Sequence, residues 1–282
     1  MPKEVVSSQA PKKKRRKWPI VLAVVAVIVI LFIILDNGEI VDDGASYSKD
    51  TLLSEEETSK MFSNTADYIG QSVNLYGQIF NEASSDDSGT FFQMFCDPEN
   101  GDKNVMIYVE GGYKVKTDNI VLVKGVVTDT YTGDNAFGAE ITGPIVSAKS
   151  VEDASYADAF APALKTVDSG AKLEVAKIQI VVDKVEFAES ETRLFVTVNN
   201  ESSGNTDIST YSASITQGGK QYDYQENYDA KYELLPDSIK PGVSASGVLV
   251  FPSIEQSDFK FIFDVNTGDD WYDGQEISVS AK

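Results

Sequence analysis

The hydrophobic and polar positions follow two different patterns along the chain. Trp18–Leu35 is an uninterrupted apolar run of eighteen residues, whereas from residue 68 onward apolar and polar residues mostly alternate between Gly-, Asp- and Ser-rich turns. A helix of this length rises about 27 Å, close to the hydrocarbon thickness of a bilayer. Alternation with period two indicates half-buried β-strands. The pattern predicts one transmembrane helix followed by a mainly β ectodomain.

Six consecutive cations, Lys12–Lys17, directly precede the apolar run. They resemble a nuclear localisation signal, but cations beside a membrane span stay in the cytoplasm and orient it. A cleaved signal peptide, the other alternative, has an apolar region of about 7–15 residues and a small-residue cleavage site. Here the run is longer and an acidic D-N-G-E follows it. We therefore expect a cytoplasmic tail (1–17), an uncleaved signal anchor (18–35) and a spacer (36–50).

Residues 51–152 combine a helix start signal with five strand-like segments. Ser54 and Glu57 form a capping-box pattern with three Glu in the first turn, which predicts a short helix over 54–66. The five strand-like segments are Ser72–Phe80, Thr90–Cys96, Asn104–Glu110, Asn119–Tyr131 and Ala139–Glu152. Glycine interrupts the long segments, as at bulges and barrel corners. We expect a small β-barrel.

Two motifs in this region resemble an OB-fold. They are a G-x-x-V-x-x-x-G-x-I opening, in GQSVNLYGQI, and a V-x-V-x-G-x-V fourth strand, in VLVKGVV. Over residues 67–152 the chain is similar to the tRNA-anticodon-binding-like domains of exported bacterial proteins. That family name implies nucleic acid as a ligand. The formal charge beyond Lys17 is −26, and a strongly acidic ectodomain repels nucleic acid, so we expect no nucleic-acid partner.

Residues 172–282 carry a second set of alternating segments, after an Ala-rich stretch (153–171) expected to be a linker or a short helix between domains. The segments are Ile178–Phe187, Thr192–Ser202, Ser209–Tyr224, Ser238–Ile254, Asp258–Asn266 and Gln275–Lys282. Gly218-Gly219 is expected to form the tight turn of a hairpin within the third segment. About seven strands at this spacing predict an antiparallel β-sandwich of the immunoglobulin-like kind.

A strand pair and a proline-glycine element carry a second resemblance. LFVTVNNES and LLPDSIKPGVSASGVLVFPSI resemble the immunoglobulin-like domain called DUF4352, or telokin-like, of exported Gram-positive proteins. The resemblance covers about residues 173–282. It implies a fold and a location outside the cell membrane, and it implies no reaction.

The composition removes several classes of chemistry. The chain has no histidine and one cysteine. Catalysis by Ser-His-Asp or Cys-His groups and histidine-ligated zinc are thus excluded, as is an intrachain disulfide. Extracellular proteins without disulfides are ordinary in Gram-positive bacteria rather than along a eukaryotic secretory route. Cys96 lies in an apolar strand-like segment and is expected to be an inert, buried thiol. We interpret the chain as non-enzymatic.

Three tyrosines are candidates for ligand binding: Tyr108, Tyr113 and Tyr131 lie on or beside expected barrel strands. OB-fold surfaces bind sugars and oligonucleotides by stacking on such rings, but the rings can also pack inside. A Tyr-rich stretch, 222–232, is expected either to form a protein-contact patch or to pack at the edge of the sandwich.

Acidic loops are the candidates for a metal. Asp269, Asp270 and Asp273 lie in one turn beside Trp271, and clustered carboxylates can bind Ca²⁺ weakly. The alternative is a solvated loop. The loop that begins at Asp97 lacks the Gly and Glu of an EF-hand, so we do not expect that motif. No other cofactor is expected.

The sequence as a whole predicts a single-pass protein of the cell membrane with its ectodomain outside. We expect it to bind a protein or a cell-wall glycan; the alternative is an accessory subunit of a membrane transport or secretion complex. A glycan-binding protein should have a ring-lined groove on the barrel. An accessory subunit should instead expose an apolar patch of several hundred Å².

Overall fold

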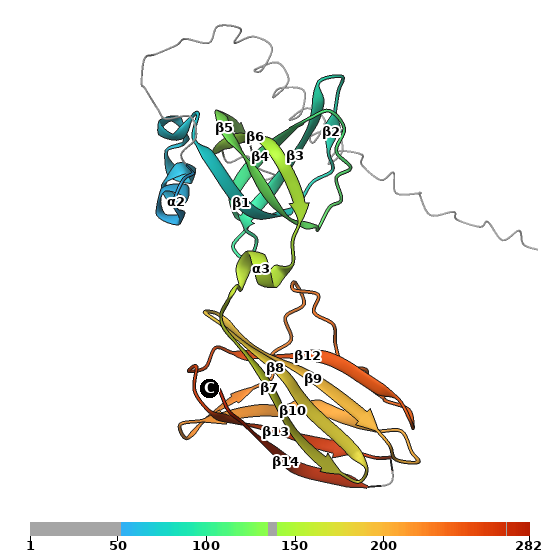
Figure 1. The fold of residues 1–282 in the computed structure, drawn as a ribbon. Helices are drawn as coiled ribbons and strands as arrows, with labels where there is room; N and C mark the ends of the chain where they lie inside the picture. The colour runs from blue at the N-terminus through green and yellow to red at the C-terminus, as the bar shows by residue number, and fades with distance from the viewer. Residues whose placement is uncertain (1–51, 135–139, 269) are drawn as a thin grey trace, which may run out of the picture. The chain divides into compact units, whose positions relative to one another are not determined.

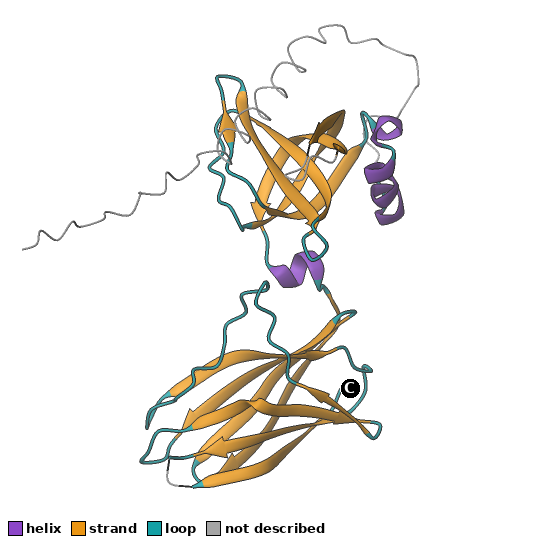
Figure 2. Ribbon diagram, turned by 180° about the vertical axis from the view of Figure 1, so that it is seen from behind, coloured by secondary structure: helices purple, strands orange, loops and turns teal. Residues whose placement is uncertain are grey.

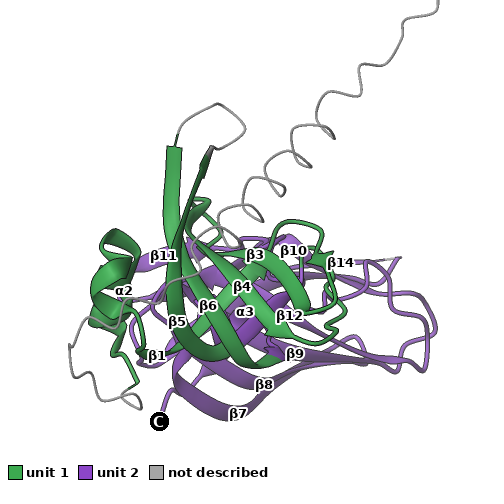
Figure 3. Cartoon of the chain, turned by 90° about the horizontal axis from the view of Figure 1, so that it is seen from above, with its two compact units in different colours: residues 1–118, 123–151 green, residues 119–122, 152–282 purple. Residues whose placement is uncertain are grey.

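The computed structural model describes residues 52–134, 140–268 and 270–282, which form two compact units (Figures 1 and 3). Unit 1 contains residues up to 118 and 123–151, and unit 2 contains 119–122 and 152–282. The expected tail, signal anchor and spacer lie outside the described residues. Within the described ranges, no helix combines the length and apolar character needed to cross a membrane.

Unit 1 begins with a capped helix, α2 (Glu55–Ser63), followed by a 3₁₀ turn at Thr65–Tyr68. The predicted capping box is present, because the backbone N–H of Glu57 donates to Oγ of Ser54 at 3.3 Å and the N–H of Ser54 donates to the Glu57 carboxylate at 2.9 Å. The helix ends before the expected residue 66, since Asn64 leaves the helical conformation.

The strands of unit 1 form one sheet that closes on itself. They are β1 (Ser72–Ile79), β2 (Ser84–Ser85), β3 (Gly89–Asp97), β4 (Asp102–Glu110), β5 (Ile120–Asp134) and β6 (Glu140–Asp153). Their order is β1-β5-β6-β4-β3-β2, and a further β1–β3 pairing joins the two sides into a barrel. β4 and β6 are parallel, with Met106 beside Ile145. Each of the five expected segments matches a strand, and β2 is an additional short one.

The interrupting glycines of the barrel lie where neighbouring strands approach closely. A Cβ atom on Gly125 of β5 would lie 2.4 Å from the backbone oxygen of Ser147, and one on Gly77 of β1 would lie 2.7 Å from the sulfur of Met94. Alternate residues of the same strands, such as Val73 and Val123, are buried. The period-two pattern therefore predicts the barrel core, and the glycines allow its strands to close around it.

Unit 2 is a two-layered β structure that begins with a short helix, α3 (Tyr156–Phe160) (Figure 2). Its strands are β7 (Ala163–Val175), β8 (Ile178–Ala188), β9 (Glu191–Asn200), β10 (Asp207–Gln217), β11 (Lys220–Asp223), β12 (Ser244–Pro252), β13 (Phe259–Asn266) and β14 (Trp271–Val279). One sheet has the order β11-β10-β13-β14 and the other β12-β9-β8-β7. Buried side chains of both sheets form one core. Gly218 and Gly219 form the predicted tight turn, with φ of 59° and 78°.

The expectation of a linker or a short helix over 153–171 agrees with α3 in its first half and is wrong in its second half. Residues 163–171 belong to β7, an edge strand that pairs with β8. Of its residues only Val167 is fully buried, and the register shifts between Asp168 and Ala171. An edge strand with so few buried apolar positions and a bulge gives little alternation, so its sequence resembles a polar connection.

An irregular segment, residues 224–243, runs beside β12 in unit 2. The N–H of Gln225 donates to the oxygen of Val250 at 2.8 Å, and the N–H of Val248 donates to the oxygen of Glu233 at 2.7 Å. A Cβ atom on Gly247 would lie 2.3 Å from the backbone nitrogen of Leu235. The segment thus covers an edge of the sandwich. The turn at Pro241-Gly242 and the strand expected after it within 238–254 are both present, and the strand, β12, begins at Ser244.

Candidate functional site

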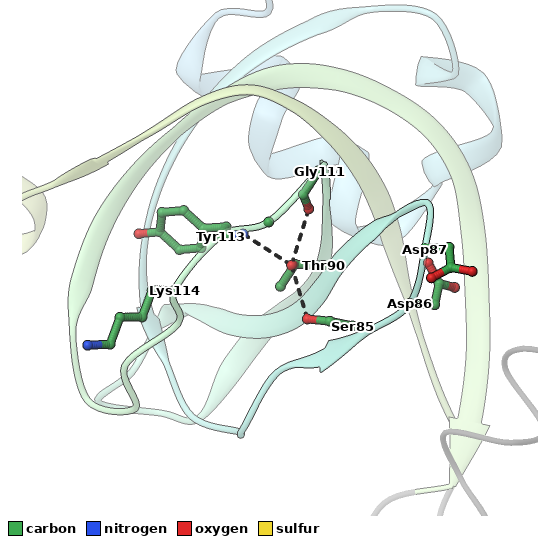
Figure 4. Close-up of a pocket in the computed structure, with 8 residues that line it drawn as sticks. Ser85, Asp86, Asp87, Thr90, Gly111, Tyr113 and Lys114 are labelled. Atoms are coloured by element: carbon green, nitrogen blue, oxygen red, sulfur yellow. Dashed lines mark hydrogen bonds between the residues drawn. The ribbon is translucent and has the colours of Figure 1, made fainter.

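A single buried hydroxyl, that of Thr90 in β3, ties together three segments of unit 1 (Figure 4). Thr90 is 1% exposed. Its Oγ1 accepts from the backbone N–H of Tyr113 at 3.2 Å, lies 3.1 Å from Oγ of Ser85, and donates to the oxygen of Gly111 at 3.4 Å. Because a buried polar atom without partners is costly, these bonds fix the β2–β3 hairpin against the segment after β4.

Between these segments is an open cleft with a volume of about 480 Å³. It is lined by Ser85, Asp86, Asp87, Thr90, Gly111, Gly112, Tyr113 and Lys114. Figure 4 shows Tyr113 and Lys114 on one side of Thr90, and the two aspartates on the other. Small-molecule sites in proteins have volumes of about 300–1,000 Å³, so the cleft is large enough for a small ligand.

The ring of Tyr113 is held by the barrel core. It stacks on Phe92 with a centroid distance of 5.7 Å and an interplanar angle of 28°, and Phe92 is itself buried. Tyr113 is half-buried, and its backbone nitrogen is fixed by Thr90. Since both the backbone and the ring are restrained, a ligand that contacts this ring loses little side-chain entropy in doing so.

Asp86 stabilises the turn that forms the acidic side of the cleft. Its Oδ1 accepts from the hydroxyl of Ser88 at 2.6 Å, from the Ser88 N–H at 2.8 Å and from the Gly89 N–H at 3.1 Å. These hydrogen bonds, led by that of the Ser88 hydroxyl, lower the pKa of Asp86. The carboxylate is therefore ionised at neutral pH, and the neighbouring Asp87 is an exposed acidic side chain.

The cleft combines four kinds of contact that suit a polyhydroxylated ligand. Tyr113 contributes an aromatic ring, the aspartates can accept hydrogen bonds, Lys114 can donate them, and Ser85 can do either. A sugar ring has apolar faces and a rim of hydroxyl groups, so it can use all four. The acidic groups are unfavourable for a phosphate or a nucleic-acid backbone.

The three predicted tyrosines have different environments. Tyr113 lines the cleft, while Tyr108 supports the nearby turn, because its hydroxyl donates to the oxygen of Ser88 at 2.9 Å. The ring of Tyr108 leaves no room for a side chain at Gly89, where a Cβ would lie 2.6 Å from a ring carbon.

Tyr131 is 5% exposed and packs with Met106 and Ile145. The structure therefore does not bring the three rings together in one groove.

The hydroxyl of Tyr131 is buried without a hydrogen-bond partner among the described residues, as is Oδ1 of Asn104. Burial raises the pKa of Tyr131 well above its usual range. Next to it lies Gly143, where a Cβ would be 2.8 Å from a carbon of the Tyr131 ring. The ring thus packs over a glycine, in an apolar setting that disfavours its phenolate.

The predicted calcium residues are only partly described. Asp269 lies outside the described residues; the N–H of Asp270 donates to Oγ1 of Thr267 at 3.1 Å, and Asp273 lies exposed in β14. In the described part of the chain, no three His, Cys, Asp or Glu residues are grouped closely enough to hold a metal ion. Calcium binding at this turn stays a prediction.

Cys96 is half-buried at the end of β3. Burial raises the pKa of its thiol to about 12. Because the thiolate is the reactive form, this environment makes the thiol a poor nucleophile at neutral pH, in keeping with the inert role expected from the sequence.

A buried ionic cluster in unit 2 was missed by the sequence analysis. Arg193 is 1% exposed. Its Nε donates a hydrogen bond to Oε2 of Glu186 at 2.8 Å. Its Nη1 donates to Oε1 of Glu191 at 2.7 Å and to the backbone oxygen of Ala161 at 2.8 Å. Glu191 also accepts from the hydroxyl of Tyr232 at 2.6 Å. The available signal was an arginine directly before the apolar run LFVTV, with acids two and seven residues before it.

Comparisons with known proteins add little to this geometry. No protein-family model and no curated protein matches the sequence. Among solved structures, the chain is similar to a functionally unknown protein from Listeria monocytogenes EGD-e, with 9% identity over 43% of this chain and 88% of that chain. The TM-score is 0.31, so the similarity carries no argument about fold or function. The class that the structure defines is a mainly β protein of two units with an open polar cleft.

Proposed function

We propose that the chain is a non-enzymatic binding protein of the cell envelope, and that its barrel cleft binds a saccharide unit of the cell wall. The observation that carries this proposal is the ring of Tyr113, which is held on the barrel core opposite two aspartates and beside Lys114. The aromatic ring matches the apolar faces of a sugar. The carboxylates and the ammonium group match its rim of hydroxyl groups.

The strand pairing supports an OB-type barrel for unit 1. The parallel β4–β6 pair and the β1–β3 closure agree with five strands closed in that topology, with β2 as an addition. OB-folds bind oligosaccharides and oligonucleotides near the loop that follows their first strand. The cleft includes residues of this connection, Ser85 to Asp87. For unit 2, two facing antiparallel sheets support an immunoglobulin-like sandwich.

The proposed location rests on the sequence. Trp18–Leu35 is long enough to span a bilayer, and the cations of Lys12–Lys17 would keep the N-terminus inside. Both units would then lie on the outer surface of a Gram-positive membrane, within reach of cell-wall polymers. The formal charge of −20 does not favour anionic polymers, which directs the proposal to neutral or zwitterionic sugars.

Co-sedimentation of the full chain with insoluble purified peptidoglycan tests this function. A detergent without a sugar headgroup is required, because a glycosidic detergent would compete for the cleft. We expect the wild type to sediment with the polymer and the double variant Asp87→Asn/Lys114→Ala to remain in solution. The matched control is Asp129→Asn/Lys116→Ala, which changes two exposed groups outside the cleft. Equal sedimentation of both variants would refute the proposal.

A further inference from the structure

Three tyrosines and one glutamate of unit 2 lie near one another. Glu226 interacts with Tyr224 and Tyr228, and both of these tyrosines also interact with Tyr211. We call Tyr211, Tyr224, Glu226 and Tyr228 the tyrosine surface. Tyr211 is 90% exposed and Tyr228 is 76% exposed, so two large rings point into solvent beside one acid. Tyrosine is enriched in protein interfaces because it offers a large contact area at low entropic cost.

An irregularity in the sheet accompanies the exposure of Tyr211. Tyr211 lies in β10 between Ser209 and Ser214, where the pairing with β13 shifts register. Such bulges redirect side chains and are common next to functional sites. Tyr224 is only partly exposed and meets Phe251 edge-on at 6.3 Å, which anchors one side of the tyrosine surface in the sandwich core.

Glu226 and Tyr228 flank Asn227, whose side chain is held by hydrogen bonds. Between them, Nδ2 of Asn227 donates to Oε2 of Glu191 at 3.1 Å, and its Oδ1 accepts from the N–H of Ala230 at 3.1 Å. Glu191 is in turn held by the buried Arg193. The half-buried Glu226 and the exposed Tyr228 thus follow an anchored backbone, and a partner would meet a preorganised surface.

The charge around the tyrosine surface selects the chemistry of its partner. Residues 152–282 contain 23 Asp and Glu against 10 Lys and Arg, a formal net charge of −13. Asp223, at the end of β11, and Asp229 are both exposed and lie three residues from Glu226 in the sequence. The face of a tyrosine ring attracts cations, most strongly the guanidinium of arginine. Negative potential, ring faces and a carboxylate all favour a cationic ligand over a neutral or acidic one.

We propose that the tyrosine surface binds a basic peptide segment of a partner protein, whose lysine and arginine side chains pack on Tyr211 and Tyr228 and donate hydrogen bonds to Glu226. The interaction is independent of the saccharide proposed for the barrel cleft. It needs no residue of that cleft, and it calls for a ligand of opposite chemistry.

Fluorescence anisotropy of a labelled hexa-arginine peptide, titrated with the full chain at physiological salt, tests the proposal. We expect Tyr211→Ala, Tyr228→Ala and Glu226→Gln each to weaken binding about three- to tenfold, the range of one cation–π or charge-assisted contact. The matched controls are Trp271→Ala, which removes another exposed ring of unit 2, and Glu201→Gln, which removes another exposed acid. Both controls should bind as the wild type does.

Three results would overturn the proposal. Equal weakening by Glu226→Gln and Glu201→Gln, with no effect of the tyrosine variants, would mean general attraction to an acidic protein. Undetectable binding of the peptide to the wild type would exclude a basic peptide as the ligand of the tyrosine surface. A change in the sedimentation coefficient of the chain alone on Tyr228→Ala would assign the surface to contact with a second copy.

Discussion

The guanidinium Nη1 of Arg193 donates a hydrogen bond to Oε1 of Glu191 at 2.7 Å. Both residues lie in unit 2, and Arg193 is only 1% exposed. Burial of an ion costs several kcal/mol unless its partners are well placed. Here the hydrogen-bond partners of Arg193 are well placed. The same glutamate holds Tyr232 and Asn227, which belong to the irregular segment beside β12. One buried pair therefore connects the second sheet to the segment that carries Tyr224, Glu226 and Tyr228 of the tyrosine surface.

Removal of Arg193 should destabilise unit 2 strongly. Arg193→Met removes the main partner of the buried Glu191 and one of the two partners of the partly buried Glu186, and we expect a loss of about 3–5 kcal/mol in the free energy of unfolding. Urea titration followed by the fluorescence of Trp271 reports on this unit. The control is Lys184→Met, because Lys184 is partly exposed beside the same Glu186 and should cost about 1 kcal/mol or less. A loss below that of the control would contradict the role given to Arg193.

Acid should weaken the same cluster. Burial alone would raise the pKa of Glu186, but the hydrogen bonds from Lys184 and Arg193 outweigh it and lower the pKa. A carboxyl whose folded pKa is depressed stabilises the fold above its unfolded pKa of about 4.3, and this contribution disappears as pH falls through the folded value. Glu186→Gln should therefore flatten the loss of stability between about pH 5 and pH 3. An unchanged pH profile, with Glu201→Gln as the reference, would disprove this linkage.

The close approach at Gly125 should make that position intolerant of a side chain. Gly125→Ala brings a Cβ against the backbone of Ser147 in β6, which we expect to destabilise the barrel by about 1–3 kcal/mol. Gly133→Ala in the same strand is the control, since a Cβ there meets nothing within 4 Å. Amide hydrogen exchange of β6 measures the difference. Equal protection of β6 in both variants would mean that the strands adjust without cost.

Loss of the Tyr131 hydroxyl should not destabilise unit 1. The group is buried without a partner among the described residues, so Tyr131→Phe removes an unpaired polar atom and keeps the ring. We expect an equal or slightly higher melting temperature, with a gain of up to about 1 kcal/mol. A clear drop in melting temperature would indicate that the hydroxyl has a partner in solution.

Local sequence patterns predict much of this fold, because alternation reports burial on one face of a strand. The capping box of α2, the five main barrel strands and the Gly218-Gly219 turn all follow from residues close in sequence. β7 was missed since its sequence alternates little. Arg193 was missed because all its partners except Glu191 come from other strands and loops, which no local period records.

The candidate site was less predictable than the fold. Tyr113 was identified as a candidate from its residue type, but its cleft exists because Thr90 bonds to segments five and more than twenty residues away in sequence. Tyr108 and Tyr131 looked equivalent to it in the sequence. Their different burial depends on cross-strand neighbours, Ser88 in one case and Gly143 in the other.

The most direct test of the central claim is calorimetric titration of the full chain with soluble peptidoglycan fragments, in a detergent without a sugar headgroup. The decisive comparison is Lys114→Ala against Lys116→Ala, two exposed lysines of one segment of which only Lys114 lines the cleft. We expect saturable binding by the wild type and by Lys116→Ala, and a loss of about tenfold for Lys114→Ala, as for one charged hydrogen bond. Equal affinities for the two variants, or no heat of binding to the wild type, would contradict saccharide binding at the barrel cleft.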